Sequence, residues 1–571
     1  MTSALALPRA FAWRGERVAF ALLLALVALL AVVPIARLAQ EAIAPRGRFD
    51  PAIFASVLSS RAVWRAAGNT VVVALGGTAL ALVAGTAFAL LVTLTDMRAK
   101  TPLVFCFMMP LMIAPQVTAL AWINLFGPNS TLLRAVGLAP APGSPHPLYG
   151  AGGIALLLGL EQAPVVFLAV RAGLRALPRD LVEAAQASGA KPWRIVRTVV
   201  LPLAMPSIAA GSMLAFVGCI GNFGIPAFLG IPAGYTVLVT LIYQRLAGFG
   251  TGVLSEVAAL SLLLALIALL GLLLNGWLAR RRDVRVTALV AAAPSWPLGR
   301  LRRLAEAIAW LAVFLVLVLP FAALTATALV PAVGVALRAG TATLANFHFV
   351  LFDYAATRRA FLNSASLAAG AAVLLVMMSV PLGYSLAERG RSVRQLVGFV
   401  AELPYALPGV VLAIAMILCL LRPLPIVGLS LYSTIWIILV AYLSRFLLLA
   451  LRPVTNALRQ IDPSLDEAAR MSGARFGRRI ATVIMPLVAP SAVAGGMLVF
   501  MMAFNELTVS ALLWSAGSET VGVVLFSLEQ AGDAVSAAAV AVIAVAVTLA
   551  LMLLANAFAS RNARAVLPWQ P

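Results

Sequence analysis

Charged residues are scarce in this sequence. They make up 11% of the 571 residues, whereas soluble domains carry about 25%. Hydrophobic residues make up 63%, and the mean hydropathy is +1.04. This composition excludes an ordinary soluble domain and predicts an all-α, polytopic membrane protein.

Cysteine and histidine are also rare. The three cysteines (Cys106, Cys219 and Cys419) lie inside apolar runs, and the two histidines (His146 and His348) stand alone in loops. Neither a disulfide framework nor a CxxC metal site fits this placement. We therefore expect no metal site and no cofactor bound by the chain.

The formal net charge of +21 is carried by short basic clusters between apolar runs. Such clusters are typical of the positive-inside pattern of membrane proteins and argue against nucleic-acid binding. The first apolar run follows Arg9, Arg14 and Arg17, as in a signal peptide, but it continues for about twenty residues without a small-x-small cleavage site. It predicts an uncleaved first helix.

Apolar runs long enough to cross a bilayer recur about twelve times. The first half has runs near 18–38, 68–94, 102–126, 150–174, 203–221 and 253–278, and the second half near 306–330, 362–386, 396–421, 430–451, 489–513 and 535–558. A polar stretch around 280–305 separates the halves. The predicted organisation is a first unit of six spans (1–279), a linker (280–305) and a second unit of six spans (306–571).

The topology and orientation follow from these spans. Two halves with six spans each, in the same order, form a parallel repeat. With the N-terminus in the cytoplasm, roughly 29 of the 41 basic residues lie on the cytoplasmic side. Both termini are then expected to be cytoplasmic.

One polar, basic segment occurs twice, between spans 4 and 5 and between spans 10 and 11. The copies are EAAQASGAKPWRIVRTVVLP (183–202) and EAARMSGARFGRRIATVIMP (467–486), offset by 284 residues without a gap. We call them the first and second EAA segments. In each, Glu-Ala-Ala is followed by Gly at +6 and Pro at +19, and both copies are predicted to face the cytoplasm.

The EAA segments have the features of a short helix, a turn and a second helical piece. Asp462 and Pro463 predict an N-cap and first helical position, and Ser464 with Glu467 fits a capping box. Copy one has Pro178 but no evident capping side chain. Gly in each copy predicts a left-handed end to the helix. The basic piece that follows is expected to break at the final proline.

These two segments resemble the EAA loops of the permeases of binding-protein-dependent ABC importers, and the resemblance covers nearly the whole chain. It implies a type I importer permease fold in which each EAA helix docks onto a separate ATPase subunit. The residues carried over are Glu183, Ala184, Ala185, Gly189 and Pro202 in one copy, and Glu467, Ala468, Ala469, Gly473 and Pro486 in the other.

The resemblance also implies the partners: two ATPase subunits, a periplasmic binding protein and the bacterial inner membrane. The chain has no GxxxxGK[ST] and only two lysines, Lys100 and Lys191. ATP hydrolysis, with its Mg²⁺, is therefore expected on the partner rather than on this chain. With GNFGIPAFLG (221–230) in the first half and FNEL (504–507) in the second, the chain looks like the ferric-iron permeases, with thiamine, 2-aminoethylphosphonate, polyamine and oxyanion importers as alternatives.

Polar residues inside spans are costly and commonly face a bundle interior. Asn222 aligns with Glu506 at the 284-residue offset, with Asn505 beside it, and Glu161 aligns with Arg445. We expect these residues near the translocation pathway. Helix–helix hydrogen bonding without substrate contact is an equal alternative for Asn222 and Glu506, and Glu161 and Arg445 form either an ion pair between the repeats or separate local contacts.

Two other functions remain open from the sequence. A secondary transporter driven by an ion gradient is also commonly built from two six-helix halves. A membrane scaffold without transport is less consistent with polar residues inside the spans. Copurification of an ATPase would favour the importer, and proton or sodium dependence would favour the secondary transporter.

Overall fold

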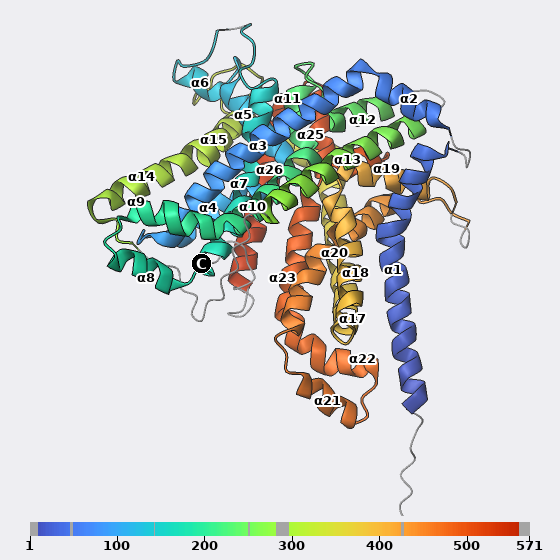
Figure 1. The fold of residues 1–571 in the computed structure, drawn as a ribbon. Coiled ribbons are helices and arrows are strands. Elements are labelled where there is room, and N and C mark those ends of the chain that lie inside the picture. Colours follow the sequence, from blue (N-terminus) through green and yellow to red (C-terminus); the bar gives the residue numbers. More distant parts are fainter. Residues whose placement is uncertain are drawn as a thin grey trace, which may run out of the picture.

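The computed structural model describes residues 9–45, 50–141, 143–248, 252–280, 296–423 and 428–558. Within these ranges the protein is helical throughout, with only an isolated bridge between Thr95 and Trp296 outside the helices. Most of the expected linker, 281–295, and the C-terminus, 559–571, lie outside the described residues. Figure 1 shows the two EAA segments at the same end of the molecule, in the helices α8 and α21.

The helices before the linker are α1 (Arg9–Ile43), α2 (Pro51–Ser59), α3 (Arg61–Leu94), α4 (Lys100–Met112), α5 (Pro115–Phe126), α6 (Thr131–Ala135), α7 (Ala151–Arg175), α8 (Arg179–Ala187), α9 (Pro192–Ile195), the π-helix η2 (Val196–Val200), α10 (Leu201–Gly221), α11 (Gly224–Gly230), α12 (Leu238–Leu246) and α13 (Val253–Arg280).

The helices after it are η3 (Gly299–Leu301), α14 (Arg302–Val313), η4 (Phe314–Val318), α15 (Leu319–Ala328), α16 (Ala345–His348), η5 (Phe349–Asp353), α17 (Ala355–Ala387), α18 (Arg391–Ala406), α19 (Gly409–Leu420), α20 (Ile435–Leu458), α21 (Pro463–Met471), α22 (Phe476–Arg479), η6 (Ile480–Ile484), α23 (Met485–Phe504), α24 (Ser510–Leu513), α25 (Val521–Gln530) and α26 (Ala534–Phe558).

Ten helices in the described residues are long and apolar enough to cross a membrane, and the number rises to twelve if two bent pairs each count as one span. This confirms the prediction of an all-α polytopic protein with about twelve spans. The bends were not predicted. Helix α4 turns into α5 through 101°, and α18 turns into α19 through 102°.

Proline explains where these two spans bend. Pro115 is the first residue of α5, and Pro408 is the N-cap of α19. A proline disfavours the helical conformation of the residue before it, so the chain leaves the helix at Ala114 and Leu407. Pro110 and Pro404, which are 294 residues apart and lie in the third span of each half, are inside α4 and α18 and not at the bends.

Each half packs three long helices together in the same way: α3, α7 and α10 in the first half, and α17, α20 and α23 in the second. A repeated polar pair ties each group to a short buried helix. Thr70 Oγ1 accepts from the N–H of Leu238, at the start of α12, at 2.8 Å. Ser364 Oγ accepts from the N–H of Val521, at the start of α25, at 3.0 Å. The two halves therefore share this structural contact as well as the sequence pattern.

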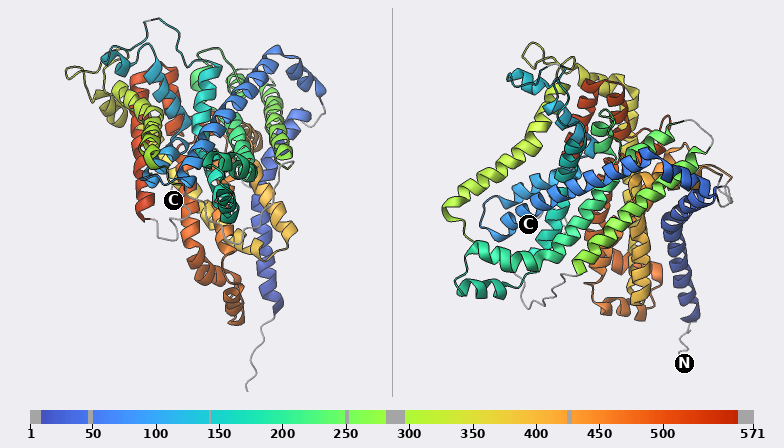
Figure 2. Two further views of the ribbon diagram at one scale, coloured as in Figure 1. Left: turned by 60° about the vertical axis from the view of Figure 1, so that its left-hand side comes forward. Right: turned by 45° about the horizontal axis from the view of Figure 1, so that its top comes forward.

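The first long helix of each half packs on the opposite half. Helix α1 contacts α18, α19 and α20, while α14 and α15 contact α4 and α5. Figure 2 shows α1, in dark blue, standing beside the orange helices of the second half. This exchange interlocks the halves, so neither six-span unit buries its core without a helix from the other.

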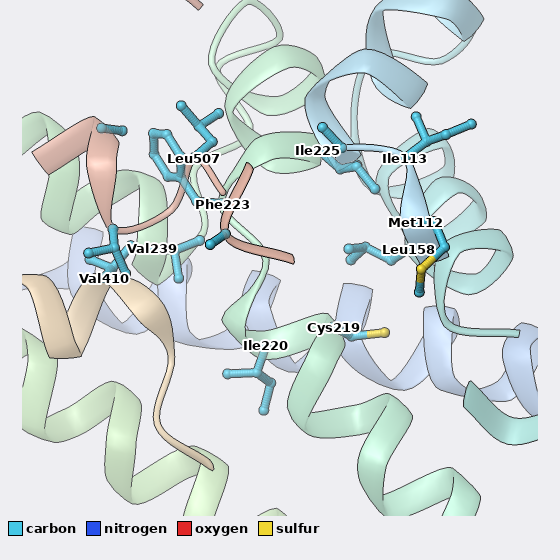
Figure 3. Packing of buried hydrophobic residues seen from close by; sticks show 14 of the residues in the cluster. Met112, Ile113, Leu158, Cys219, Ile220, Phe223, Ile225, Val239, Val410 and Leu507 are labelled. Carbon is cyan, nitrogen blue, oxygen red and sulfur yellow. The ribbon is translucent and has the colours of Figure 1, made fainter. Parts of the chain in front are cut away.

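The apolar core continues between the halves. Figure 3 shows Phe223 of the first half close to Leu507 of the second, and Ile225 and Val410 belong to the same apolar cluster. The ring of Phe223 meets that of Phe526 edge-on, with centroids 5.8 Å apart. Polar side chains at this seam are therefore surrounded by apolar ones.

Candidate functional site

The two EAA segments have the same backbone. Each runs from a nine-residue helix (α8 or α21), through a glycine, to a four-residue helix (α9 or α22), then through a π-helical turn (η2 or η6) into a long span (α10 or α23). The equivalence holds position by position at the 284-residue offset. The segment is thus one structural unit built twice.

A Schellman motif ends the first helix of each copy, as the glycines predicted. Gly189 and Gly473 have φ values of +74° and +76°. Gly189 N–H donates to Gln186 O at 2.9 Å, and Gly473 N–H donates to Arg470 O at 2.9 Å. The next residue in each copy donates to the carbonyl five residues back, Ala185 or Ala469, at 3.1 Å.

The starts of the two helices differ. Asp462 caps α21 by accepting from the N–H of Ser464 at 2.9 Å, and this backbone hydrogen bond holds the pKa of Asp462 below its usual value. The predicted capping box of Ser464 with Glu467 is wrong: with Asp462 as N-cap, Ser464 is two residues into the helix and is itself the capped residue. Pro178 caps α8 without a side-chain hydrogen bond.

The final prolines do not break the chain's helical path. Pro202 and Pro486 are the second residues of α10 and α23, directly after the π-helical turns. The continuous helical stretches extend from Pro192 to Gly221 and from Phe476 to Phe504. The expected break is therefore wrong; the π turn accommodates the residue that lacks an N–H.

Both EAA helices present an exposed face with apolar residues on it. Ala184 and Ala468 are exposed, and Ala185 and Ala469 are half-buried. Leu181 and Trp193 are exposed around the first helix, and Leu465 and Met471 around the second, with Met471 88% exposed. Small and large apolar side chains on an otherwise polar helix are typical of a surface that docks into a groove.

The opposite, buried sides of the EAA helices differ in chemistry. In the first segment Val182 and Ile195 are each 1% exposed and belong to the apolar core. The equivalent residues of the second segment are Asp466 and Arg479, and the Arg479 side chain is 2% exposed. Sequence reasoning missed this difference, although the 284-residue offset would have shown a buried apolar pair replaced by a charged pair.

The polar residues expected in the membrane form two equivalent local pairs. Asn222 Nδ2 donates to Glu161 Oε2 at 2.7 Å in the first half. In the second half Arg445 interacts electrostatically with Glu506. Because 161 and 222 correspond to 445 and 506 at the same offset, a hydrogen bond in the first half and an electrostatic interaction in the second occupy equivalent places. The predicted ion pair between Glu161 and Arg445 is not among the contacts of the described residues.

Asn222 and Glu506 also perform the same structural task. Asn222 Oδ1 accepts from the N–H of Ile225 at 3.0 Å, and Glu506 Oε1 accepts from the N–H of Val509 at 2.8 Å. Each side chain thus satisfies the amide three residues later, where a short buried helix begins. These contacts favour the structural alternative over direct substrate contact.

Asn505 contacts the other half of the protein. Its Nδ2 donates to Met112 O at 3.0 Å, at the bend between α4 and α5. Gln116 Nε2 donates to Asn505 O at 3.4 Å. Gln116, which sequence reasoning missed, is 2% exposed. Asn505 and Gln116 therefore place a polar contact in the apolar seam between the halves.

The sequence profile of the family described as "Binding-protein-dependent transport system inner membrane component" matches residues 77–284 and 379–567. The two matches together cover well over half of the chain, and each contains one EAA segment. The chain belongs to this family.

The permease is similar to several named relatives. It is 28% identical to the probable ABC transporter permease protein y4fN of Sinorhizobium fredii, over 73% of this chain and 74% of the relative. It is 24% identical to the ferric transport system permease protein FbpB of Actinobacillus pleuropneumoniae, over 68% of this chain and 55% of the relative. The chain thus spans about half the length of that ferric relative.

A third relative aligns with about a quarter of the permease. The molybdenum transport system permease protein ModB of Haemophilus influenzae is 32% identical over 24% of this chain and 58% of its own length. Among solved structures, the inward-facing MetNI methionine ABC transporter aligns with 39% of this chain and 95% of its own, at 22% identity and a TM-score of 0.29.

Proposed function

We propose that this chain supplies both permease halves of an ABC importer, which moves a solute delivered by a binding protein. The observation that carries the proposal is the pair of EAA segments with identical backbones at the same end of the molecule. Each offers one exposed docking face. One chain with two ATPase subunits then forms a complete transporter, and the permease itself is not an enzyme.

The mechanism follows from the positions of these faces. ATP binding draws the two ATPase subunits together, and the two EAA helices move with them. Because each EAA segment continues without a break into α10 or α23, this movement reaches Asn222 and Asn505 at the far ends of those helices. The seam between the halves then opens alternately to either side of the membrane, the inner bacterial membrane in our proposal, with both termini in the cytoplasm.

Ferric iron is the substrate that we favour. The two ferric relatives align with 68% and 72% of this chain and so include both halves. Molybdenum relatives are more similar locally, but they align with 24% and 22% of it. An oxyanion is therefore the second candidate, and thiamine, 2-aminoethylphosphonate and polyamines follow.

Reconstitution tests the proposal. The chain is coexpressed with candidate ATPase subunits and placed in proteoliposomes, and ferric, molybdate, thiamine and aminoethylphosphonate binding proteins are added in turn with their cargo. We expect one loaded binding protein to stimulate ATP hydrolysis and uptake, and the double variant Glu183→Ala, Glu467→Ala to abolish both. If no ATPase copurifies and uptake follows an ion gradient, the permease is a secondary transporter.

A further inference from the structure

A buried arginine joins the second EAA segment to a helix of the opposite half. Arg479 is the last residue of α22, and its Nη2 lies 2.6 Å from Glu16 Oε1 of α1. Its Nε lies 3.8 Å from Asp466 Oδ1 of α21. The guanidinium also sits over the ring of Tyr384, 5.6 Å from its centroid. Arg479 thus contacts three helices from inside the protein.

Further charged groups surround this arginine. Asp466 accepts from the hydroxyl of Tyr384 at 2.6 Å and from Arg470 Nε at 2.8 Å. Arg470 also pairs with Glu388, directly after α17. We call the whole set the Arg479 cluster: Glu16, Tyr384, Glu388, Asp466, Arg470 and Arg479. Figure 1 shows α21 and α22 at the lower end of α17, with α1 alongside.

The first half has an apolar contact at the equivalent place. The residues 284 positions before Asp466, Arg470 and Arg479 are Val182, Gln186 and Ile195. Helix α14, the counterpart of α1, attaches elsewhere. Arg302 pairs with Asp96 at 3.4 Å, in the segment between α3 and α4. In the second EAA segment a buried arginine thus pairs with a carboxylate of an exchanged helix, whereas Val182 and Ile195 occupy the equivalent positions of the first segment.

The physical consequence concerns geometry more than stability. A buried ion pair stabilises a fold little compared with apolar residues of the same volume, because both charges lose their hydration. It does require its partners to keep one relative position, since separating them would leave a charge buried alone. Apolar contacts such as those of Val182 and Ile195 are not directional, so they fix the relative position of two elements less strictly than a guanidinium paired with carboxylates. The Arg479 cluster is therefore the more rigid attachment.

We propose that the Arg479 cluster makes α1 and the second EAA segment one rigid unit, with Arg479 as its positioning residue. Movement of the second EAA helix is then passed directly to α1 and, through it, to α13 of the first half. The first EAA helix moves independently of α14. This inference rests on the proposed coupling function. It adds that the ATPase subunit on the second EAA segment moves a helix of the opposite half as well, whereas the subunit on the first EAA segment does not.

Spin-label distances test the rigid unit in the assembled transporter. Pairs of cysteines are introduced in a variant whose three native cysteines are replaced by serine. The pair Ser188 and Ser472 reports the distance between the two EAA segments. The pair Arg17 and Ser472 reports the distance between α1 and the second segment. The pair Arg303 and Ser188 reports the distance between α14 and the first segment and is the control. All four positions are exposed, and each pair is measured with and without ATP.

We expect the distance between Ser188 and Ser472 to shorten with ATP, that between Arg17 and Ser472 to stay constant, and that between Arg303 and Ser188 to change. Arg479→Leu, and the milder Glu16→Gln, should broaden the distance between Arg17 and Ser472 and leave the control pair as it was. Uptake per ATP hydrolysed should fall several-fold while the ATPase still copurifies.

Two results would overturn the rigid unit: an ATP-dependent change between Arg17 and Ser472 as large as in the control pair, or no effect of either variant on that distance. Failure of the proposed function gives a different result. In that case the distance between the two EAA segments does not respond to ATP at all, whereas the variants still report on the attachment of α1.

Discussion

Asn222 and Glu506 occupy equivalent places and satisfy equivalent amides with different side chains. The neighbouring residues differ as well: Asn222 donates to the carboxylate of Glu161, whereas Glu506 interacts electrostatically with Arg445. An amide hydrogen-bonded to an acid in one half corresponds to an acid near a base in the other. Each half has thus kept a buried polar contact while its chemistry diverged, as expected when an unpaired polar group inside a membrane protein is costly.

The contact between Glu161 and Asn222 predicts the effect of removing either residue. Glu161→Leu leaves the buried Asn222 amide without its acceptor, and we expect a loss of about 1–3 kcal/mol in stability. Glu161→Gln retains an acceptor and should cost less. The double variant Glu161→Leu, Asn222→Leu removes the unpaired Asn222 donor but leaves the Ile225 N–H without its acceptor, so we expect it to recover only part of the loss.

Thermal unfolding of the purified variants provides this measurement. A double variant as unstable as the sum of the two single ones would show that the residues do not depend on each other. Loss of uptake in Glu161→Gln without any change in thermal stability would instead favour the pathway role expected from the sequence.

Asp462 predicts a pH effect limited to the second EAA helix. Its pKa is lowered by the hydrogen bond from the Ser464 N–H, so the cap stabilises α21 above the usual pKa of an aspartate. The contribution is lost as the pH falls through the lowered value in the folded protein. Between pH 5 and pH 8, about the range of a transport assay, the cap should therefore be unchanged.

Hydrogen exchange followed by mass spectrometry can measure the cap directly. Asp462→Ala should make the amides of α21 exchange roughly three- to tenfold faster, whereas Asp462→Asn, which can also cap, should change them little. Helix α8 has no side-chain cap and is the internal control. Equal acceleration in α8 would mean that the effect is not local to the cap.

At the scale of elements, the EAA segments were predictable and the short buried helices were not. The motif carries its own local signals: acids at the start, glycine at the end and a fixed spacing. Helices α11, α12, α24 and α25 lie within apolar stretches in which four to ten residues show no distinguishable period. The bends could not be predicted from proline alone, because Pro164, Pro381 and Pro453 lie inside helices that are not interrupted.

The glycines of the EAA segments predict a backbone effect on docking. A Cβ added at Gly189 or Gly473 would meet no atom within 4 Å, so substitution strains only the left-handed backbone. We expect Gly189→Ala and Gly473→Ala each to weaken ATPase binding several-fold, and the asparagine variants to retain more of it, because asparagine tolerates this conformation better.

Titration of the labelled ATPase against the reconstituted permease measures this affinity. The control is Gly477→Ala, since Gly477 lies inside α22 with an open Cβ position and without a positive φ. If that control weakens binding as much as Gly473→Ala, the left-handed backbone is not the cause.

At the scale of the whole molecule, the exchange of first helices was not predictable. The sequence of α1 does not indicate which half the helix contacts, because an apolar helix face can pack against many partners. The structure shows contacts of α1 with α18, α19 and α20, and of α15 with α5 and α6. The spans and the repeat could therefore be derived from hydropathy and offset alone, while the interlocking of the halves depends on contacts between distant parts of the chain.

This exchange predicts the behaviour of a divided chain. If the protein is expressed as two pieces, cut within 281–295, each piece contains a first helix whose packing partner is on the other piece. Each piece alone exposes the apolar surfaces of α5 and α19 that the exchanged helices cover, so we expect it to aggregate or to be degraded. Coexpressed pieces should copurify as a one-to-one complex with a thermal stability close to that of the intact permease.

Removing α1 from the coexpressed pair separates exchange from simple association. Without α1, the second half lacks its cover over α19 and the Glu16 partner of Arg479, so its unfolding temperature should fall although all of its own spans are intact. A first piece that is monodisperse and fully stable alone would show that the exchanged contacts contribute little. In that case the second EAA segment would also have to keep its geometry without α1, although Arg479 would have lost its partner Glu16.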